Sequence, residues 1–134
     1  KKTKIKPTYN VAVGLIYKKD KFIITKRKAN VMLGGLWELP GGKKNNKESY
    51  KDCLHREIQE ELNIKIEVDK KIGLVKHSYS HFSINLIGYV CSYLSGTPKA
   101  IASDDIKWIK ISNIKNFAFP KSTNKLFKLI MDKN

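Results

Sequence analysis

Three glutamates lie within one short segment of this sequence: Glu57, Glu60 and Glu61. On a helix these positions are i, i+3 and i+4, so the three carboxylates share one face. Like charges this close repel each other, and the usual compensation is a hard divalent cation with oxygen ligands, Mg²⁺ or Mn²⁺. A cation held in this way neutralises phosphate oxygens and lowers the pKa of bound water. The spacing therefore predicts a metal-assisted reaction at a phosphate group.

Gly42, which precedes the expected helix, and Asn63, which follows it, suit the same hypothesis. Gly42 has no side chain, which lets its backbone carbonyl approach an ion. Asn63 tolerates the left-handed conformation that ends a helix. An acidic run can also be no more than a solvated helix face. Because the 134 residues carry a net charge of +15, general surface solvation explains an isolated acidic cluster poorly.

A helix must position these carboxylates, and the sequence predicts one over 48–62, where Tyr50, Leu54, Ile58 and Leu62 recur every four residues. Apolar and alternating runs predict strands at 11–17, 21–26, 64–68, 72–77, 82–93 and 108–111, a long loop over 28–36, and a second helix that follows Pro120 and ends near Met131. Strands that alternate irregularly with two helices predict a mixed sheet flanked by helices. No linker or repeat divides the sequence, so residues 1–134 are expected to form a single domain.

The acidic helix and the loop before it carry a recognisable motif. Gly42, Glu48, Arg56, Glu57, Glu60 and Glu61 match the Nudix box, Gly-x5-Glu-x7-Arg-Glu-U-x-Glu-Glu-x-Gly-U, in which U is aliphatic. The chain thus resembles the Nudix hydrolase family over nearly its whole length. Asn63 stands where the family has glycine, and asparagine tolerates the same backbone conformation. The resemblance implies an α/β (α+β) fold, an αβα sandwich around a mixed sheet.

The resemblance also implies roles for the residues of the box. Glu57, Glu60 and Glu61, with the carbonyl of Gly42, would bind Mg²⁺, with Mn²⁺ as a substitute. Two further residues, Arg56 and Glu48, would take part in catalysis by holding the loop and orienting the carboxylates. The general base stays open between Asp105, from a loop, and Glu57 itself.

Two subgroups of the family share the stretch from Leu33 to Gly42: the MutT pyrophosphohydrolases and the C-terminal domain of the adenine glycosylase MutY. Residues 79–82 resemble the Phe-Ser-His loop of that glycosylase domain. From these resemblances we expect substrate contacts by Arg27, Ser80, His81 and Asn124. Trp37, beside two leucines, is expected to pack in the core.

The leading hypothesis is Mg²⁺-dependent hydrolysis of 8-oxo-dGTP or a related nucleotide to a monophosphate and pyrophosphate. A second hypothesis keeps the reaction but takes ADP-ribose or another nucleoside diphosphate derivative as the substrate. Larger ADP-ribose hydrolases usually have an N-terminal extension, and its absence favours a compact triphosphate. A third hypothesis is a non-catalytic reader of 8-oxoguanine in DNA, like the MutY domain. The carboxylates of the box are all retained here, which favours the two enzyme hypotheses over the non-catalytic reader.

Composition limits the partners and the location. The net charge of +15 suits nucleic-acid contact, steering of small anions, or a coding bias toward Lys, Ile and Asn, and the sequence leaves these open. A small nucleotide is the expected partner, and nucleic acid is less favoured. No signal peptide or membrane span is expected, so the chain is expected to be cytoplasmic, as a monomer or weak dimer. Cys53 and Cys91 are expected to be reduced and partly buried.

Overall fold

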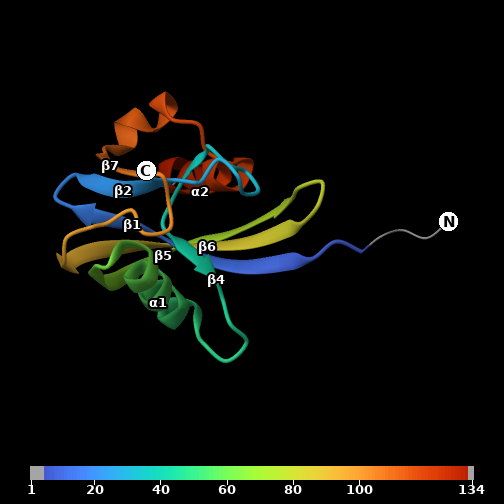
Figure 1. Ribbon diagram of the computed structural model, residues 1–134, viewed down its shortest axis with the longest axis horizontal. Helices are drawn as coiled ribbons and strands as arrows, with labels where there is room; N and C mark the ends of the chain where they lie inside the picture. The colour runs from blue at the N-terminus through green and yellow to red at the C-terminus, as the bar shows by residue number, and fades with distance from the viewer. Residues whose placement is uncertain (1–4, 133–134) are drawn as a thin grey trace.

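The computed structural model describes residues 5–132. These residues form a mixed seven-stranded sheet with one helix on each face (Figure 1). The strands are β1 (Thr8–Lys18), β2 (Lys21–Lys26), β3 (Trp37–Glu38), β4 (Gly41–Lys43), β5 (Lys65–Ser78), β6 (Ser83–Ser95) and β7 (Asp105–Ile109). The helices are α1 (Tyr50–Leu62), the 3-10 helix η1 (Ile111–Asn116) and α2 (Lys121–Asp132). The αβα sandwich around a mixed sheet is confirmed.

Strand β1 is the centre of the sheet. It pairs in parallel with β6 from Thr8 to Tyr17, and antiparallel with β2 and β4. Strand β5 pairs antiparallel with β6, and β2 carries β3 and β7. Because the pairing between β1 and β4 places Ala12 opposite Gly42, the loop before α1 is fixed directly to the central strand.

The two faces of the sheet bury separate cores. Side chains alternate along β1, so that Ala12 and Ile16 pack with residues of α1, whereas Val13 and Leu15 pack with residues of α2. Trp37 belongs to the core on the α2 side, with 9% of its surface exposed, which confirms its expected role. Within residues 5–132, neither α1 nor α2 has the length and hydropathy needed to cross a membrane.

Helix α1 begins and ends with specific capping interactions. The Ser49 hydroxyl accepts a hydrogen bond from the backbone N–H of Asp52 at 3.1 Å, which satisfies one free donor of the first turn. Asn63 follows the helix with φ 58° and ψ 41°, and its N–H donates to the carbonyl of Gln59 at 3.0 Å. The left-handed conformation expected at Asn63 is therefore confirmed, and the predicted stripe buries Leu54, Ile58 and Leu62.

Four strands differ from the sequence-based expectations. The strands expected at 64–68 and 72–77 are one strand, β5, because irregularities near Lys65, Val68 and Lys71 keep the polar stretch between them paired with β6. Strand β7 is Asp105–Ile109 rather than 108–111, since η1 begins at Ile111. Strands β3 and β4 are only two and three residues long, too short to show a period in the sequence.

Candidate active site

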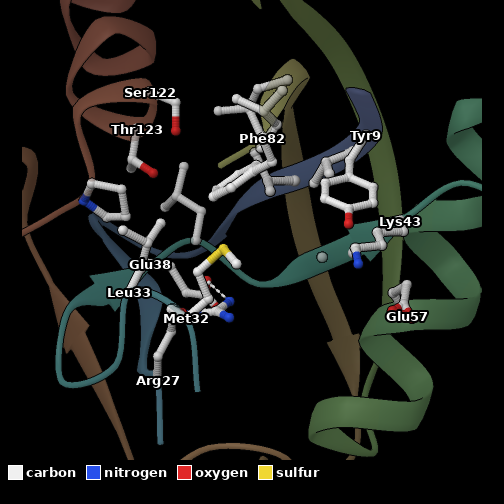
Figure 2. Close-up of a pocket in the computed structure, with 18 of the residues that line it drawn as sticks. Tyr9, Arg27, Met32, Leu33, Glu38, Lys43, Glu57, Phe82, Ser122 and Thr123 are labelled. Atoms are coloured by element: carbon white, nitrogen blue, oxygen red, sulfur yellow. Dashed lines mark hydrogen bonds and ion pairs between the residues drawn. The ribbon is translucent and has the colours of Figure 1, made fainter. Parts of the chain in front are cut away.

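A pocket of about 370 Å³ lies between the acidic face of α1 and the first turn of α2 (Figure 2). Its floor consists of residues from β1, β4 and β6, and Arg27 with the loop after β2 closes one side. Two of the three clustered glutamates of α1, Glu57 and Glu61, line it at one end, and Ser122 and Thr123 line it at the other. The pocket therefore has an acidic end and an end lined by hydroxyl groups.

The three glutamates have different environments. Glu61 accepts a hydrogen bond from the backbone N–H of Gly41 at 3.2 Å, and Glu57 accepts one from Arg56 at 3.1 Å. Glu60 lies outside the pocket lining, with 58% of its side chain exposed and its carboxylate 3.4 Å from Arg56. Over residues 5–132, no three His, Cys, Asp or Glu side chains converge as a group able to hold a metal. The pocket thus offers two carboxylates rather than a cage of three.

The absence of a side chain at Gly42 makes this arrangement possible. A Cβ at this position would overlap the Glu57 carboxylate. The φ angle of Gly42 is not in the left-handed region, so the requirement for glycine is one of space rather than of backbone conformation. The Gly42 carbonyl accepts a hydrogen bond from the thiol of Cys53 at 3.4 Å, and a carbonyl oxygen has a second lone pair for another partner.

Arg56 connects the loop before α1 to the carboxylates on the helix. Its Nη2 and Nε donate to the two oxygens of Glu48 at 2.7 and 3.1 Å, and its Nη2 also donates to the carbonyl of Lys43 at 3.2 Å. The hydrogen bonds from Arg56, followed by one from the backbone N–H of Asn45, lower the pKa of Glu48 to about 2. Glu48 is therefore ionised over the whole physiological range, and it fixes the loop to the helix.

The pKa values of the two pocket carboxylates are raised rather than lowered. Burial, with the nearby charges of Glu38 and Glu57, raises the pKa of Glu61 to about 8. Burial also raises the pKa of Glu57, against the charge of Arg56. The positive charges of Arg56 and Arg27 do not offset the burial of these two acids. Two carboxylates beside a backbone carbonyl suit Mg²⁺, which keeps several waters and takes few protein ligands. The residues present therefore fit a divalent cation, which Glu57, Glu61 and the Gly42 carbonyl would hold.

The sequence-based reasoning missed Glu38 as a pocket residue. Glu38 lines the pocket and forms an ion pair with Arg27, with Nη1 and Oε2 3.0 Å apart. Arg27 also donates from Nε to the carbonyl of Met32 at 2.9 Å, so it holds the loop after β2 against the pocket. Burial raises the pKa of Glu38, and Arg27 opposes this shift. The sequence did contain a signal for Glu38, because successive side chains of a strand point to opposite faces of the sheet. Since Trp37 is buried in the core, its neighbour Glu38 points to the other face.

Of the four residues expected to contact substrate, Arg27 alone lines this pocket. Ser80 lines a shallower neighbouring hollow beside the first turn of α2. Neither pocket lining includes His81 or Asn124, both of which are exposed, and the Asn124 amide donates instead to the carbonyl of Phe119 at 3.3 Å. Ser122 and Thr123 take the place expected for Asn124, because the helical turn that begins at α2 points Asn124 away from the pocket.

Asp105, the candidate general base, also lies outside the pocket lining. It is the first residue of β7 and is exposed, and its carboxylate accepts a hydrogen bond from the N–H of Ile106 at 2.8 Å. Glu38, Glu57 and Glu61 are the acidic side chains in the lining. Of the two alternatives for the base, the structure places Glu57 in the pocket and Asp105 outside it.

The chain matches known proteins in sequence and in fold. A family model described as the NUDIX domain matches residues 12–129. An 8-oxo-dGTP diphosphatase of Buchnera aphidicola subsp. Schizaphis graminum is 32% identical over 111 residues, which cover 83% of this chain and 84% of that protein. A CTP pyrophosphohydrolase of Escherichia coli is 30% identical over 98 residues, 73% of each chain. The crystal structure of a MutT protein from Methanosarcina mazei superposes with a TM-score of 0.86 at 24% identity, covering 98% of this chain and 99% of that one.

The chain therefore belongs to the Nudix family of domains. Within that family it is a MutT-like pyrophosphohydrolase, an enzyme that cleaves phosphoanhydride bonds in small nucleotide substrates.

Proposed function

We propose that this enzyme hydrolyses 8-oxo-dGTP, or a closely related nucleoside triphosphate, to the monophosphate and pyrophosphate in a reaction that depends on Mg²⁺. The observation that supports this proposal is the two-ended pocket, with Glu57 and Glu61 at one end and a neutral, partly aromatic end at the other. The 32% identity with an 8-oxo-dGTP diphosphatase supports the choice of substrate.

The acidic end suits the phosphate chain of such a substrate. When bound, Mg²⁺ would supply positive charge to the phosphate oxygens and lower the pKa of a water molecule. Glu57 and Glu61, with the Gly42 carbonyl, would hold the cation, and the resemblance to the family adds Glu60. The ammonium group of Lys43 lies 3.8 Å from the centre of the Tyr9 ring at the same end of the pocket, where it supplies charge for a phosphate (Figure 2).

The reaction itself needs water to be activated beside the phosphate chain. A bond forms between the water oxygen and phosphorus, and the bridging P–O bond breaks, which releases pyrophosphate. We propose Glu57 as the acceptor of the proton, because Asp105 lies outside the pocket lining. Arg56 would keep Glu57 in position through the 3.1 Å hydrogen bond between them. Arg27 would hold the loop at Met32 over the substrate.

Three alternatives are compared with this proposal. A pyrimidine triphosphate is the second candidate substrate, because the chain is 30% identical with a CTP pyrophosphohydrolase. A non-catalytic reader of 8-oxoguanine in DNA is the alternative that the loop over residues 79–82 and the net charge of +15 suggest. ADP-ribose represents the nucleoside diphosphate derivatives in the same test.

The experiment is a nucleotide panel with Mg²⁺ that contains 8-oxo-dGTP, dGTP, CTP and ADP-ribose, with products separated by ion exchange. We expect the highest kcat/KM for 8-oxo-dGTP, with monophosphate and pyrophosphate as products. Glu61→Gln should reduce the rate by several orders of magnitude. Glu67→Gln is the matched control, because Glu67 is an exposed glutamate on β5, outside the pocket lining. Tight binding of 8-oxoguanine duplex without hydrolysis of any nucleotide would contradict the proposal.

A further inference from the structure

The positive charge of the chain is concentrated on one side of the molecule. Residues 106–131 contain six lysines and no aspartate or glutamate. By contrast, six of the twelve acidic residues lie between Glu38 and Glu61, in a segment that ends within α1. Because α1 and α2 lie on opposite faces of the sheet, the face covered by α2 is the more positive one (Figure 1).

Three lysines form an exposed row along α2. Lys121, Lys125 and Lys128 are spaced by four and three residues, which places them on the same side of the helix over a length of about 10 Å. The opposite side of α2 buries Leu126 and Phe127. None of the three lysines forms an ion pair with another residue in the range 5–132. The charge of this lysine row is therefore uncompensated.

The positive charge continues from the lysine row to the loop between β5 and β6. Burial lowers the pKa of His77 at the end of β5, and the charges of Lys125 and Lys121 lower it further. Lys6 donates from Nζ to the carbonyl of Tyr79 at 2.7 Å, which brings another charge to this loop. The lysine row and the loop thus form one positive surface.

The shallow hollow beside the first turn of α2 belongs to the same surface. Lys121, His77 and Ser80 take part in its lining, which contains no acidic residue. Proteins hold nucleic-acid backbones with lysine ammonium groups together with the side chains of serine, asparagine and tyrosine. Ser80 in the hollow and the exposed Asn124 within the row supply such neutral groups beside the lysines.

Two other kinds of anionic partner fit this surface less well. A helix that binds a lipid surface buries apolar side chains in it, whereas the apolar side of α2 is already buried in the core of the protein. A protein interface has an apolar centre, and the exposed large hydrophobic residue of α2, Met131, lies beyond the last lysine of the row. A phosphodiester chain carries a uniform charge and is bound through that charge.

We propose that the lysine row of α2 and the adjoining loop between β5 and β6 bind the phosphodiester backbone of a nucleic acid. Contacts with phosphates carry no sequence information, so the binding is independent of sequence. The lysine row lies outside the lining of the catalytic pocket, and no base has to enter that pocket. The inference therefore does not depend on the proposed hydrolysis, and it differs from a reader of 8-oxoguanine.

The test compares two triple variants with the same change in net charge. The lysine-row variant combines Lys121→Gln, Lys125→Gln and Lys128→Gln. The control uses three exposed lysines that lie on α1 or close to its C-terminal end, and it combines Lys51→Gln, Lys65→Gln and Lys99→Gln. Thermal melting establishes that both variants are folded.

Fluorescence anisotropy without Mg²⁺ measures the binding of labelled oligonucleotides as single-stranded DNA, duplex DNA and RNA, which identifies the nucleic acid that is bound best. The lysine-row variant should raise the Kd at least about 10-fold and reduce the slope of log K against log salt by about 2 to 3. The control should change the Kd less than about 3-fold, because its lysines lie away from the surface.

Equal losses in the two variants would show that net charge alone attracts the nucleic acid, and they would overturn the inference. So would the absence of binding by the wild type, or displacement of the oligonucleotide by polyglutamate at equal charge. Tighter binding to vesicles that contain phosphatidylserine would overturn it in favour of a lipid surface. Because the anisotropy is measured without turnover, failure of hydrolysis in the nucleotide panel would refute the proposed function and leave this result unchanged.

Discussion

Arg56 binds both carboxylate oxygens of Glu48, with Nη2–Oε1 and Nε–Oε2 distances of 2.7 and 3.1 Å. The planar guanidinium matches a carboxylate at two points, which lysine cannot do. The remaining Nη1 of Arg56 contacts Glu57 and Glu60. The same side chain thus anchors the loop before α1 and sets the position of a pocket carboxylate, so damage to the pair should affect both stability and catalysis.

Glu48→Gln should lower the free energy of unfolding in a manner that depends on pH. The pKa of Glu48 is lowered from 4.5 to about 2, so the folded state favours the ionised form. Its contribution is fully present above pH 4.5, and it is lost as the pH falls toward about 2. In urea unfolding, the difference between wild type and variant should be largest at neutral pH and shrink over this range. A difference independent of pH would contradict the assignment.

Gly42→Ala should lower activity while leaving the fold largely intact. Its backbone is not in the left-handed region, but a Cβ there would overlap the Glu57 carboxylate and displace it. We expect a loss of about 10- to 100-fold in Mn²⁺ affinity, measured by electron paramagnetic resonance, and in kcat/KM.

Gly41→Ala provides the contrast. Gly41 has φ 150°, and its Cβ would overlap the backbone of Ala12, so this variant should lose stability first. Normal Mn²⁺ affinity in Gly42→Ala would show that Glu57 does not need the space beside this glycine.

Tyr79→Phe removes one side-chain hydroxyl and should thereby destabilise the protein. The Tyr79 oxygen bonds to both the hydroxyl and the N–H of Ser122, and its loss should lower the free energy of unfolding by about 1 kcal/mol. Tyr17→Phe is a matched control, because the structure describes no hydrogen bond at the Tyr17 hydroxyl. Equal changes in the two variants, measured by thermal melting, would count against the bridge between α2 and the loop before β6.

The sequence predicted the parts of this molecule that local rules determine. The spacing of Leu54, Ile58 and Leu62 located α1, and Asn63 marked its end, because helix periodicity and backbone conformation depend on neighbouring residues alone. The β5 strand was divided in two because Asp69 and its lysine neighbours look like a turn, whereas irregular pairing with β6 keeps them in the sheet. Such pairing depends on a partner that is distant in the sequence.

The candidate site likewise has a part that the sequence predicted and a part that it did not. The box residues share one helix and its loop, so their proximity follows from spacing. The far end of the pocket depends on the rotation of α2 relative to the sheet, and a shift of one residue exchanges Thr123 for Asn124. Glu38 was missed because its pairing with Arg27 joins two strands, β3 and the end of β2. Sequence spacing says nothing about side chains that meet across strands.

The two cysteines should be unreactive in the folded protein. Both are free and more deeply buried than expected from the sequence, with 0% of Cys53 and 1% of Cys91 exposed. Burial raises the pKa of Cys53 to about 11 and that of Cys91 to about 12, so neither supplies much thiolate, the reactive form, at neutral pH.

Near pH 8, Ellman's reagent should modify neither thiol of the native protein within minutes, and it should modify both at once in concentrated guanidinium chloride. Cys53→Ala and Cys91→Ala would identify the thiol responsible for any early reaction. Rapid modification of Cys53 in the native state would mean that α1 separates readily from β4, because the Cys53 thiol donates to the Gly42 carbonyl across that contact.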